Sequence, residues 1–287
     1  MKTFFKNSKR GVFLLTLLLA VNFLTAQDKN FHIYLCLGQS NMEGHARPQA
    51  EDSAGVSERF KVLAAVNCDN RGRLQGNLYT ALPPLARCNT GLTPADYFGR
   101  TMLEHLSKNI TVGVINVSVG GCKIELFDKD NFQSYVDGSP DWLKNTVKAY
   151  DGNPYQRLVD MARIAQKSGV IKGILLHQGE SNTGDSLWTK KVKGVYDNLL
   201  KDLNLKPNSV PLLAGHLVSE DQNGACASMN KIISTLPQVI PNAHVISSVG
   251  CEGVKDRLHF SAAGYRKLGR RYAATMLALM GKKITVE

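Results

Sequence analysis

The chain has 287 residues, of which 43% are hydrophobic and 21% are charged. This balance is ordinary for a globular protein and excludes an intrinsically disordered or fibrous chain. The formal charge is +11, but the first 26 residues contribute four basic residues and no acidic ones, which leaves +7 for the remainder. The other basic residues are dispersed and no nucleic-acid motif accompanies them, so we expect no nucleic-acid partner.

The first 26 residues predict a cleavable secretory signal peptide. A basic stretch runs from Lys2 to Arg10, an apolar run follows from Gly11 to Leu24, and Ala26 precedes a polar segment. This three-part pattern is typical of exported proteins. The apolar run is shorter than the roughly 20 residues that a membrane span needs, although an uncleaved anchor is the alternative. We expect a secreted or periplasmic protein without stable membrane insertion after cleavage, with residues 27–287 forming a single domain.

Short apolar runs alternate with helix-like segments along the rest of the chain. Strands are predicted at residues 31–37, 112–117, 170–176, 210–217 and 243–249. Helices are predicted at residues 94–107, 154–168, 187–203, 226–236 and 261–280. Short, continuously apolar strands between helices are typical of a parallel sheet that helices cover on both faces. We therefore predict a three-layer α/β/α sandwich, flavodoxin-like, with about five parallel strands.

Residues 45–92 interrupt this alternation, because they are rich in Gly, Pro, Asn and Arg. We interpret them as a long surface excursion, and insertions of this kind often serve function. Cys68 and Cys88 both lie in this stretch, and we expect them to form a disulfide in an oxidising compartment. Cys226 and Cys251 are the second choice for a pair.

Chemically reactive side chains follow four of the predicted strands. In open α/β sheets the ligand site lies beyond the carboxyl ends of the strands, and these ends carry a serine, paired glycines, an amide and an Asp/His pair. The segments are Gly38-Gln39-Ser40-Asn41-Met42, Ser118-Val119-Gly120-Gly121-Cys122, His177-Gln178-Gly179-Glu180-Ser181-Asn182 and Asp256-Arg257-Leu258-His259-Phe260. Together they supply the nucleophile, base, orienting acid and oxyanion donors that acyl transfer needs.

Each of these residues alone has an ordinary structural explanation. A serine after a glycine at a strand end is commonly a turn or N-cap residue, and a lone histidine commonly packs or faces solvent. Asp256 and His259 together are more informative, because residues three apart in a turn can direct both side chains to one side. His177 and Gln178 point to opposite faces of a strand, so we expect His177 to have a structural role.

The four segments, in this order, resemble the blocks of the SGNH hydrolase superfamily. The branch that they resemble most is the sialate O-acetylesterase type domain, which includes the acetylxylan esterases of carbohydrate esterase family six. The resemblance spans about residues 31–280, and Thr93-Pro94-Ala95-Asp96-Tyr97-Phe98 is similar to a segment that this branch carries before its second block. Gln178 stands where the wider superfamily usually has an asparagine, which favours this branch. The chain has no Gly-x-Ser-x-Gly motif, so the α/β-hydrolase fold is disfavoured.

The resemblance implies a serine esterase that removes O-acetyl groups from a carbohydrate through an acetyl-enzyme intermediate. Ser40 would be the nucleophile, His259 the base and Asp256 the acid that orients the imidazole. The oxyanion hole would contain the backbone N–H groups of Ser40 and of Gly121, which is favoured over Gly120.

The Gln178 side chain would complete this oxyanion hole. Glu180 and Asn41 are candidate pocket residues, and Glu180 is also the alternative to Asp256 as the acid behind His259. No Cys-x-x-Cys or His-Glu-x-x-His spacing occurs, so we predict no metal site, and the chemistry requires no organic cofactor.

The expected partner is an acetylated polysaccharide or oligosaccharide substrate, as for an acetylxylan esterase. A sialate or pectin O-acetylesterase or a feruloyl esterase on the same scaffold is the alternative. A non-catalytic sugar-binding protein is disfavoured, because the serine, aspartate and histidine are all present. The oligomeric state stays open at this point.

Overall fold

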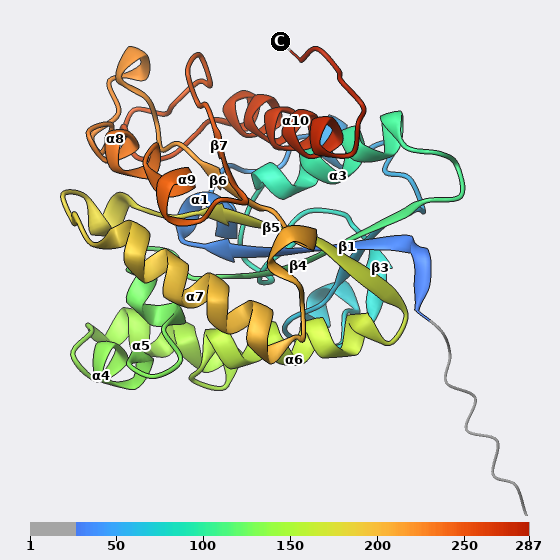
Figure 1. The fold of residues 1–287 in the computed structure, drawn as a ribbon. Helices are drawn as coiled ribbons and strands as arrows, with labels where there is room; N and C mark the ends of the chain where they lie inside the picture. The colour runs from blue at the N-terminus through green and yellow to red at the C-terminus, as the bar shows by residue number, and fades with distance from the viewer. Residues whose placement is uncertain (1–26, 287) are drawn as a thin grey trace, which may run out of the picture.

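The structure is a computed structural model that describes residues 27–286. Seven strands form one sheet, with the bounds β1 (Asp28–Gly38), β2 (Phe60–Leu63), β3 (Leu78–Thr80), β4 (Thr111–Ser118), β5 (Gly169–His177), β6 (Leu212–Gly215) and β7 (Ala243–Ile246). They lie in the order β3-β2-β4-β1-β5-β6-β7, and every neighbouring pair is parallel except β2 and β3 (Figure 1).

Helices cover both faces of this sheet. Their bounds are α1 (Ser40–Glu43), α2 (Ala50–Ser53), α3 (Pro94–His105), α4 (Phe132–Asp137), α5 (Asp141–Val147), α6 (Pro154–Gln166), α7 (Trp188–Asp202), α8 (Met229–Ile233), α9 (Leu236–Val239) and α10 (Ala262–Leu279). α3 and α10 lie on one face, and α6 and α7 lie on the other, with α4 and α5 beside them (Figure 1). The predicted α/β/α sandwich is therefore confirmed.

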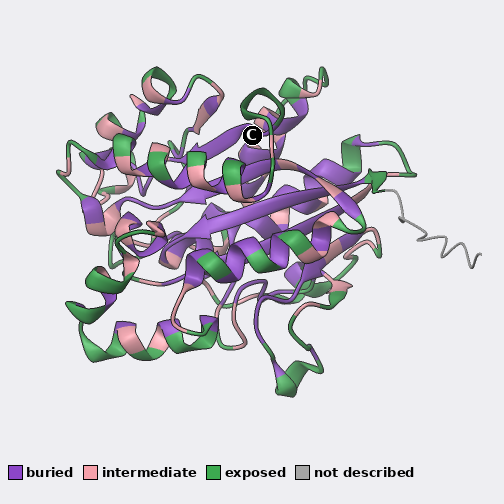
Figure 2. Ribbon diagram, turned by 60° about the horizontal axis from the view of Figure 1, so that its bottom comes forward, coloured by how far each residue is buried: buried purple, intermediate pink, exposed green. Residues whose placement is uncertain are grey.

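The pleat of β1 explains why both faces need helices. Ile33, Leu35 and Leu37 belong to the core under α6 and α7, whereas Tyr34 and Cys36 belong to the core under α3 and α10. Successive side chains of a strand point to opposite faces, and all five are at most 2% exposed. Figure 2 shows the result, with buried strands inside and helices that are exposed on their outer sides.

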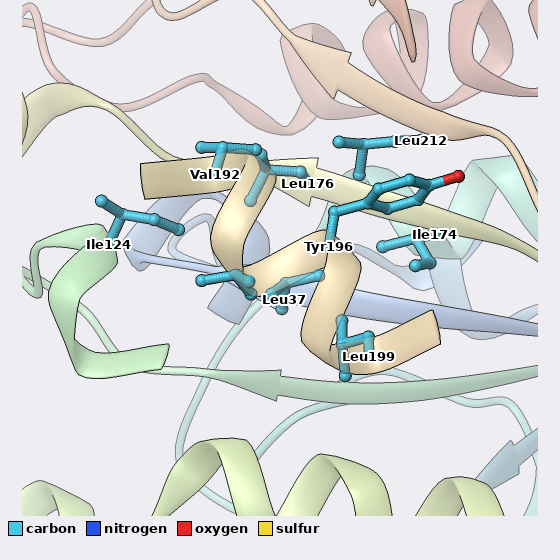
Figure 3. A pocket seen from close by; sticks show the side chains of 9 residues that line it. Leu37, Ile124, Ile174, Leu176, Val192, Tyr196, Leu199 and Leu212 are labelled. Atoms are coloured by element: carbon cyan, nitrogen blue, oxygen red, sulfur yellow. The ribbon is translucent and has the colours of Figure 1, made fainter. Parts of the chain in front are cut away.

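The helix α7 closes one of these cores with an apolar face. A void of about 10 Å³ lies between α7 and the sheet. The side chains around it, most of them labelled in Figure 3, are Leu37, Ile124, Ile174, Leu176, Val192, Val195, Tyr196, Leu199 and Leu212. The Tyr196 hydroxyl donates to the carbonyl oxygen of Val210 at 2.7 Å. A void of this size is near the lower limit for one water, and its apolar walls offer water no partners. We therefore interpret this contact as packing rather than as a binding site.

Residues 45–92 form more than a surface excursion. They supply the edge strands β2 and β3, and β2 pairs in parallel with β4. The sheet thus has two strands more than the five predicted, because the short runs of β2 and β3 lie within a stretch rich in Gly, Pro, Asn and Arg that obscures their pattern. The expected disulfide between Cys68 and Cys88 is present in this segment.

The second expected disulfide, between Cys226 and Cys251, is wrong, because both residues are free thiols. The Sγ of Cys226 lies 3.7 Å from the carbonyl oxygen of Glu180. Cys251 is buried in the core on the other face of the sheet, near Arg271 of α10. The two thiols pack against different cores, which their sequence context does not reveal.

The strand order places three of the four reactive segments side by side. β1 lies between β4 and β5, and Gly38 at its end is in register with Ser118 of β4 and His177 of β5. The chain leaves all three strands at the same edge of the sheet, which is where open α/β sheets form their crevice. The fourth segment follows β7 and must return past β6 to reach this edge.

Within residues 27–286, no helix combines the length and apolar character needed to span a membrane. The predicted signal peptide, residues 1–26, lies outside the described residues.

Candidate active site

Ser40, His259 and Asp256 form a hydrogen-bonded chain where β1 ends. The Ser40 Oγ lies 2.8 Å from the Nε2 of His259, and the Nδ1 of His259 lies 2.7 Å from the Oδ2 of Asp256. An ionised carboxylate can only accept, so Nδ1 carries the proton and Nε2 accepts the hydroxyl proton of Ser40. This is the tautomer in which an imidazole can act as a base toward a serine.

Ser40 begins α1 directly after β1, and Gly38 makes this turn possible. A Cβ built on Gly38 would lie 2.1 Å from the carbonyl oxygen of His177. The two strands can therefore approach this closely only because residue 38 lacks a side chain. The N–H of Gln39 donates to the same carbonyl oxygen at 3.1 Å. The close approach of β1 and β5 thus fixes the place of the serine.

A single turn holds Asp256 and His259 together, as the spacing predicts. The Oδ1 of Asp256 accepts the backbone N–H groups of Leu258 at 2.8 Å and of His259 at 3.0 Å, which leaves Oδ2 for the imidazole. Desolvation raises the pKa of Asp256, but the hydrogen bonds from the His259 ring and from these N–H groups outweigh it and lower the pKa to about 2. Asp256 therefore stays ionised at neutral pH.

Asn41 does not line the pocket but connects the first segment to the fourth. Its Nδ2 donates to the carbonyl oxygen of Leu258 at 2.9 Å and to the Oε1 of Glu180 at 2.5 Å. Its Oδ1 accepts the hydroxyl of Tyr265 at 2.6 Å. The side chain is fully buried. The expectation of a pocket residue is corrected, because Asn41 instead holds the loop that carries His259.

Glu180 lines the pocket, as expected. Its Oε1 accepts from Asn41, while its Oε2 is buried and has no partner among residues 27–286. Burial raises the pKa of Glu180 to about 7, although the hydrogen bond from Asn41 and the charge of His259 act against this. Of the two acids that the sequence left open, it is Asp256 that bonds the Nδ1 of His259.

The glycine pair after β4 lies beside Ser40. The N–H of Gly120 donates to the Oε2 of Glu43 at 3.1 Å. The N–H groups of Ser40 and Gly121, by contrast, have no acceptor in the described part of the chain. Gly121 has a φ of 71°, a conformation that strains any other residue. The free N–H groups are thus those of the two residues that the sequence favours as oxyanion donors.

Glu43 is a site residue that the sequence analysis missed. It is 8% exposed, and its Oε1 accepts two N–H groups of Arg87 at 2.9 and 2.6 Å. Burial raises the pKa of Glu43, and the Arg87 guanidinium acts against this rise. Arg87 precedes Cys88, so the disulfide to Cys68 tethers the chain next to this ion pair. Its spacing from Ser40 could have indicated this role, because residues three apart in a helical turn lie on the same side of the helix.

Gln178 is not among the residues that line the pocket, so the expected oxyanion contact is corrected. The side chain is 1% exposed. Its Nε2 donates to the Oδ1 of Asn182 at 2.7 Å and to the carbonyl oxygen of Cys122 at 3.3 Å, while its Oε1 accepts the indole N–H of Trp188. These contacts tie the end of β5 to α7 and to the loop after β4.

Gln39 lines the pocket in front of Gln178. Its Oε1 accepts from the Nε2 of Gln178 at 3.2 Å, and from the N–H groups of Gly179 at 3.4 Å and Ser181 at 3.3 Å. Three donors therefore hold the oxygen end of this carboxamide. Its Nε2 has no acceptor within the described residues, which leaves an N–H donor at the pocket.

Two aromatic side chains that the sequence analysis did not name complete the pocket, which has a volume of about 470 Å³. The ring of His45 stacks on that of His259, with centroids 3.7 Å apart and 9° between the planes. Burial and the neighbouring His259 lower the pKa of His45, which favours an uncharged ring beside the base. Trp142, on α5, lies against Gly121. No motif marks either residue.

His45, Asp256 and His259 are also close enough to be considered as metal ligands, since one ligand atom of each lies within 4.8 Å of the others. Ring nitrogens bind metals in the plane of the ring, and two nearly parallel planes share no common point for an ion. Both nitrogens of His259 already have partners. The arrangement suits a base and its orienting acid better than a metal centre.

Comparisons with known proteins agree with this fold. A family model described as carbohydrate esterase, sialic acid-specific acetylesterase, matches residues 30–278. A protein from Arabidopsis thaliana is similar with a TM-score of 0.66 at 20% identity, over 88% of this chain and 99% of that chain. NanS is similar with a TM-score of 0.64 at 17% identity, over 89% and 99%. A carbohydrate acetylesterase from Xanthomonas citri is similar with a TM-score of 0.61 at 16% identity, over 88% and 57%.

At these identities the structural likenesses show a shared fold. The family model goes further, because it spans nearly all of the described residues. The resemblance to the sialate O-acetylesterase type domain is thereby confirmed. The chain belongs to the carbohydrate esterase family of sialic acid-specific acetylesterases, and it is a carboxylic ester hydrolase.

Proposed function

We propose that this protein is a serine O-acetylesterase that acts on an acetylated carbohydrate of the acetylxylan type, with Ser40 as its nucleophile. The observation that carries the proposal is the hydrogen-bonded chain from Ser40 through His259 to Asp256, in an open pocket at the end of the sheet. A protein that only bound sugar would not need a base aligned with a serine at 2.8 Å.

The reaction proceeds in two halves. As the Ser40 Oγ forms a bond to the acetyl carbon, the Nε2 of His259 takes its proton and the carbonyl oxygen becomes an oxyanion. The N–H groups of Ser40 and Gly121 donate to that oxyanion, and Asp256 stabilises the charged imidazole. When the ester C–O bond breaks, His259 returns the proton to the sugar oxygen. Water then attacks the acetyl-enzyme by the same proton path and releases acetate.

Gln39 is our candidate for the third oxyanion donor, in place of Gln178. Its carboxamide oxygen is held from behind by three N–H groups. The opposite end of a planar amide points the other way, so its Nε2 is available to a ligand in the pocket that Gln39 lines. A neutral amide can donate to a developing anion without first breaking an ion pair.

Acetate release from acetylated xylan tests this function. Ser40→Ala should lower turnover by about 10⁶, the loss seen when a serine nucleophile is removed from a triad. Ser118→Ala is a matched control, because Ser118 ends the neighbouring strand in register with Gly38 but does not line the pocket. A folded Ser40→Ala variant with undiminished activity would contradict the proposal, as would a phosphonate label that maps to Ser181.

We also propose that residues 1–26 direct export and that the processed chain begins at Gln27. The Cys68–Cys88 disulfide supports an oxidising compartment. Amino-terminal sequencing of the protein from the periplasm or medium of expressing cells should begin at Gln27. Recovery of active protein only from the cytosol, with the first 26 residues attached, would contradict export.

A further inference from the structure

Trp142 is an exposed aromatic side chain inside the wall of the proposed active site. Its side chain is 54% exposed, whereas the other tryptophan, Trp188, is fully buried. It lines the same pocket as Ser40 and His259. Single exposed apolar residues are common on protein surfaces. An exposed indole in the same pocket as a nucleophile is different, because a substrate that enters the pocket can displace the water and cover the indole.

The backbone holds this indole in a fixed place. Trp142 lies on α5, whose inner residues Leu143 and Val147 are 1% and 2% exposed and anchor the helix in the core. A Cβ built on Gly121 would lie 2.6 Å from the Cη2 of Trp142. The edge of the indole therefore sits directly against the glycine that we assign to the oxyanion hole. An ester whose carbonyl oxygen meets the N–H of Gly121 brings the rest of the substrate next to the indole.

The size of the indole indicates what it contacts. An aromatic side chain of this kind buries 150–250 Å² when it is covered, and an acetyl methyl group can cover only a small part of that area. The C–H face of a pyranose ring is flat, apolar and large enough to cover an indole. The pocket of about 470 Å³ has room for such a ring beside the acetyl group.

The charges around the pocket indicate which sugars fit. The described residues that line it include the carboxyl groups of Glu43 and Glu180 but no lysine or arginine. The nearby Arg87 is engaged by Glu43. A carboxylate on the bound ring would therefore find no free lysine or arginine among the lining residues, and an unpaired charge is costly where water is displaced.

We propose that Trp142 is the stacking platform for the sugar ring that carries the acetyl ester, and that this subsite accepts an uncharged pyranose and disfavours a uronate. The inference rests on the proposed function and adds the substrate class to it. Trp142 acts on binding of the sugar, whereas Ser40 and His259 act on the ester bond.

Kinetics on three ligands test the platform. For an acetylated methyl xyloside, Trp142→Ala should raise KM about 3- to 10-fold, the range expected for loss of one aromatic stacking contact, and Trp142→Phe should retain most of the affinity. Leu187→Ala is the matched control, because Leu187 is 52% exposed and lies outside the pocket lining. For ethyl acetate, which has no ring, Trp142→Ala should raise KM less than it does for the xyloside, and an equal rise for both esters would overturn the platform. An unchanged KM for the xyloside would overturn the platform.

The charge selection needs a substrate pair that differs only in charge. Acetate release from an acetylated methyl galacturonide should be at least about tenfold less efficient than release from its uncharged carboxamide, and added salt should narrow the gap. Equal efficiencies would overturn the selection. If the wild type releases no acetate even from ethyl acetate, the proposed function fails, and the inference fails with it.

Fluorescence supplies a readout that does not depend on turnover. Trp142 is the exposed member of the two tryptophans. In a Ser40→Ala background, the acetylated xyloside should protect fluorescence from quenching by iodide. The same titration of Ser40→Ala with Trp142→Phe should show no protection. Protection that persists without Trp142 would place the sugar elsewhere and overturn the proposal.

Discussion

The two sides of the pocket are built in different ways. Ser40 follows β1 and Gly121 follows β4. These strands are adjacent and parallel, so their register fixes the separation between the two residues. His45 lies in the loop after α1, and Trp142 lies on α5, in the long connection between β4 and α6. The sheet thus sets the groups that must meet within hydrogen-bond distance, while these connecting segments shape the space around them. Substitutions on the first side should change turnover, and those on the second should change recognition.

After Ser40→Ala, the largest effect expected among the catalytic residues comes from Asp256→Asn. An asparagine can donate to Nδ1 and so favour the tautomer in which Nε2 carries the proton and cannot accept one from Ser40. The comparable substitution in chymotrypsin-like proteases lowers turnover by about 10⁴, and we expect a loss of that order in kcat with little change in KM.

Glu180→Gln is the comparator, since it leaves the contact between Asp256 and His259 intact. It should lower kcat by much less. If Glu180→Gln were the more damaging change, Glu180 would be the orienting acid and the assignment of Asp256 would be wrong.

Glu43→Gln tests whether the contact from Arg87 through Glu43 to Gly120 supports the turn that carries the oxyanion donor Gly121. A glutamine offers one oxygen where the carboxylate serves both Gly120 and Arg87, so one of these contacts is lost. Because Gly121 is displaced rather than removed, we expect kcat to fall by about 10- to 100-fold, less than the 10²–10³ for loss of an oxyanion donor. Stopped acetate-release assays at saturating substrate would measure this.

Asp52→Asn provides the control for general damage. It breaks another buried carboxylate–arginine pair, with Arg266, outside the pocket. A fall in kcat of equal size in both variants would show that the Glu43 effect is not specific to the oxyanion turn.

The same comparison explains how far the sequence could predict the molecule. Five strands, the long helices α3, α6, α7 and α10, and the Ser40, His259 and Asp256 set follow from apolar runs and from residues at strand ends, because a parallel sheet forces those ends together. Trp142 and His45 could not be predicted, since their positions depend on how the chain between the regular strands folds back. The edge strands β2 and β3 were missed because these short runs lie within residues 45–92, which are rich in Gly, Pro, Asn and Arg.

Side-chain direction was the other limit. Gln178 stands at a strand end, as a site residue should, yet it faces inward, because Asn182 and the indole of Trp188 satisfy its amide. Glu43 is the opposite case. No motif marks it as a site residue, yet its carboxylate accepts the N–H of Gly120, next to the oxyanion donor Gly121. Position along a strand predicts which end a residue occupies, whereas its rotamer depends on neighbours that are distant in sequence.

The buried carboxyl of Glu180 predicts a pH dependence of stability. Its pKa of about 7 in the folded chain exceeds the ordinary value of 4.5, so the folded state binds more protons between these values. Stability from this group is therefore complete below pH 4.5 and is lost as pH rises through 7. The shift corresponds to at most about 3 kcal/mol. The melting temperature of Glu180→Gln relative to wild type should rise from pH 5 to pH 8, and a constant difference would contradict the burial argument.

The smallest effect on kcat is expected from Gln178→Ala. This substitution tests whether Gln178, which stands at a strand end, has a structural role or a catalytic one. The substitution leaves the buried indole N–H of Trp188 without its partner, while the Oδ1 of Asn182 keeps the N–H of Ile124. An unsatisfied buried group costs about 1–3 kcal/mol. A chain of this size loses about 2–4 °C in melting temperature per kcal/mol, so we expect a fall of roughly 2–12 °C. The kcat of the folded fraction should stay near the wild-type value, because the Gln39 carboxamide oxygen loses Gln178 but keeps the N–H groups of Gly179 and Ser181. Gln39→Ala, one layer nearer the pocket, should show the opposite signature, with a clear loss of kcat at unchanged KM. A Gln178→Ala variant that melts like the wild type but turns over about 10²-fold more slowly would return this residue to the oxyanion hole and assign to Gln39 the structural role.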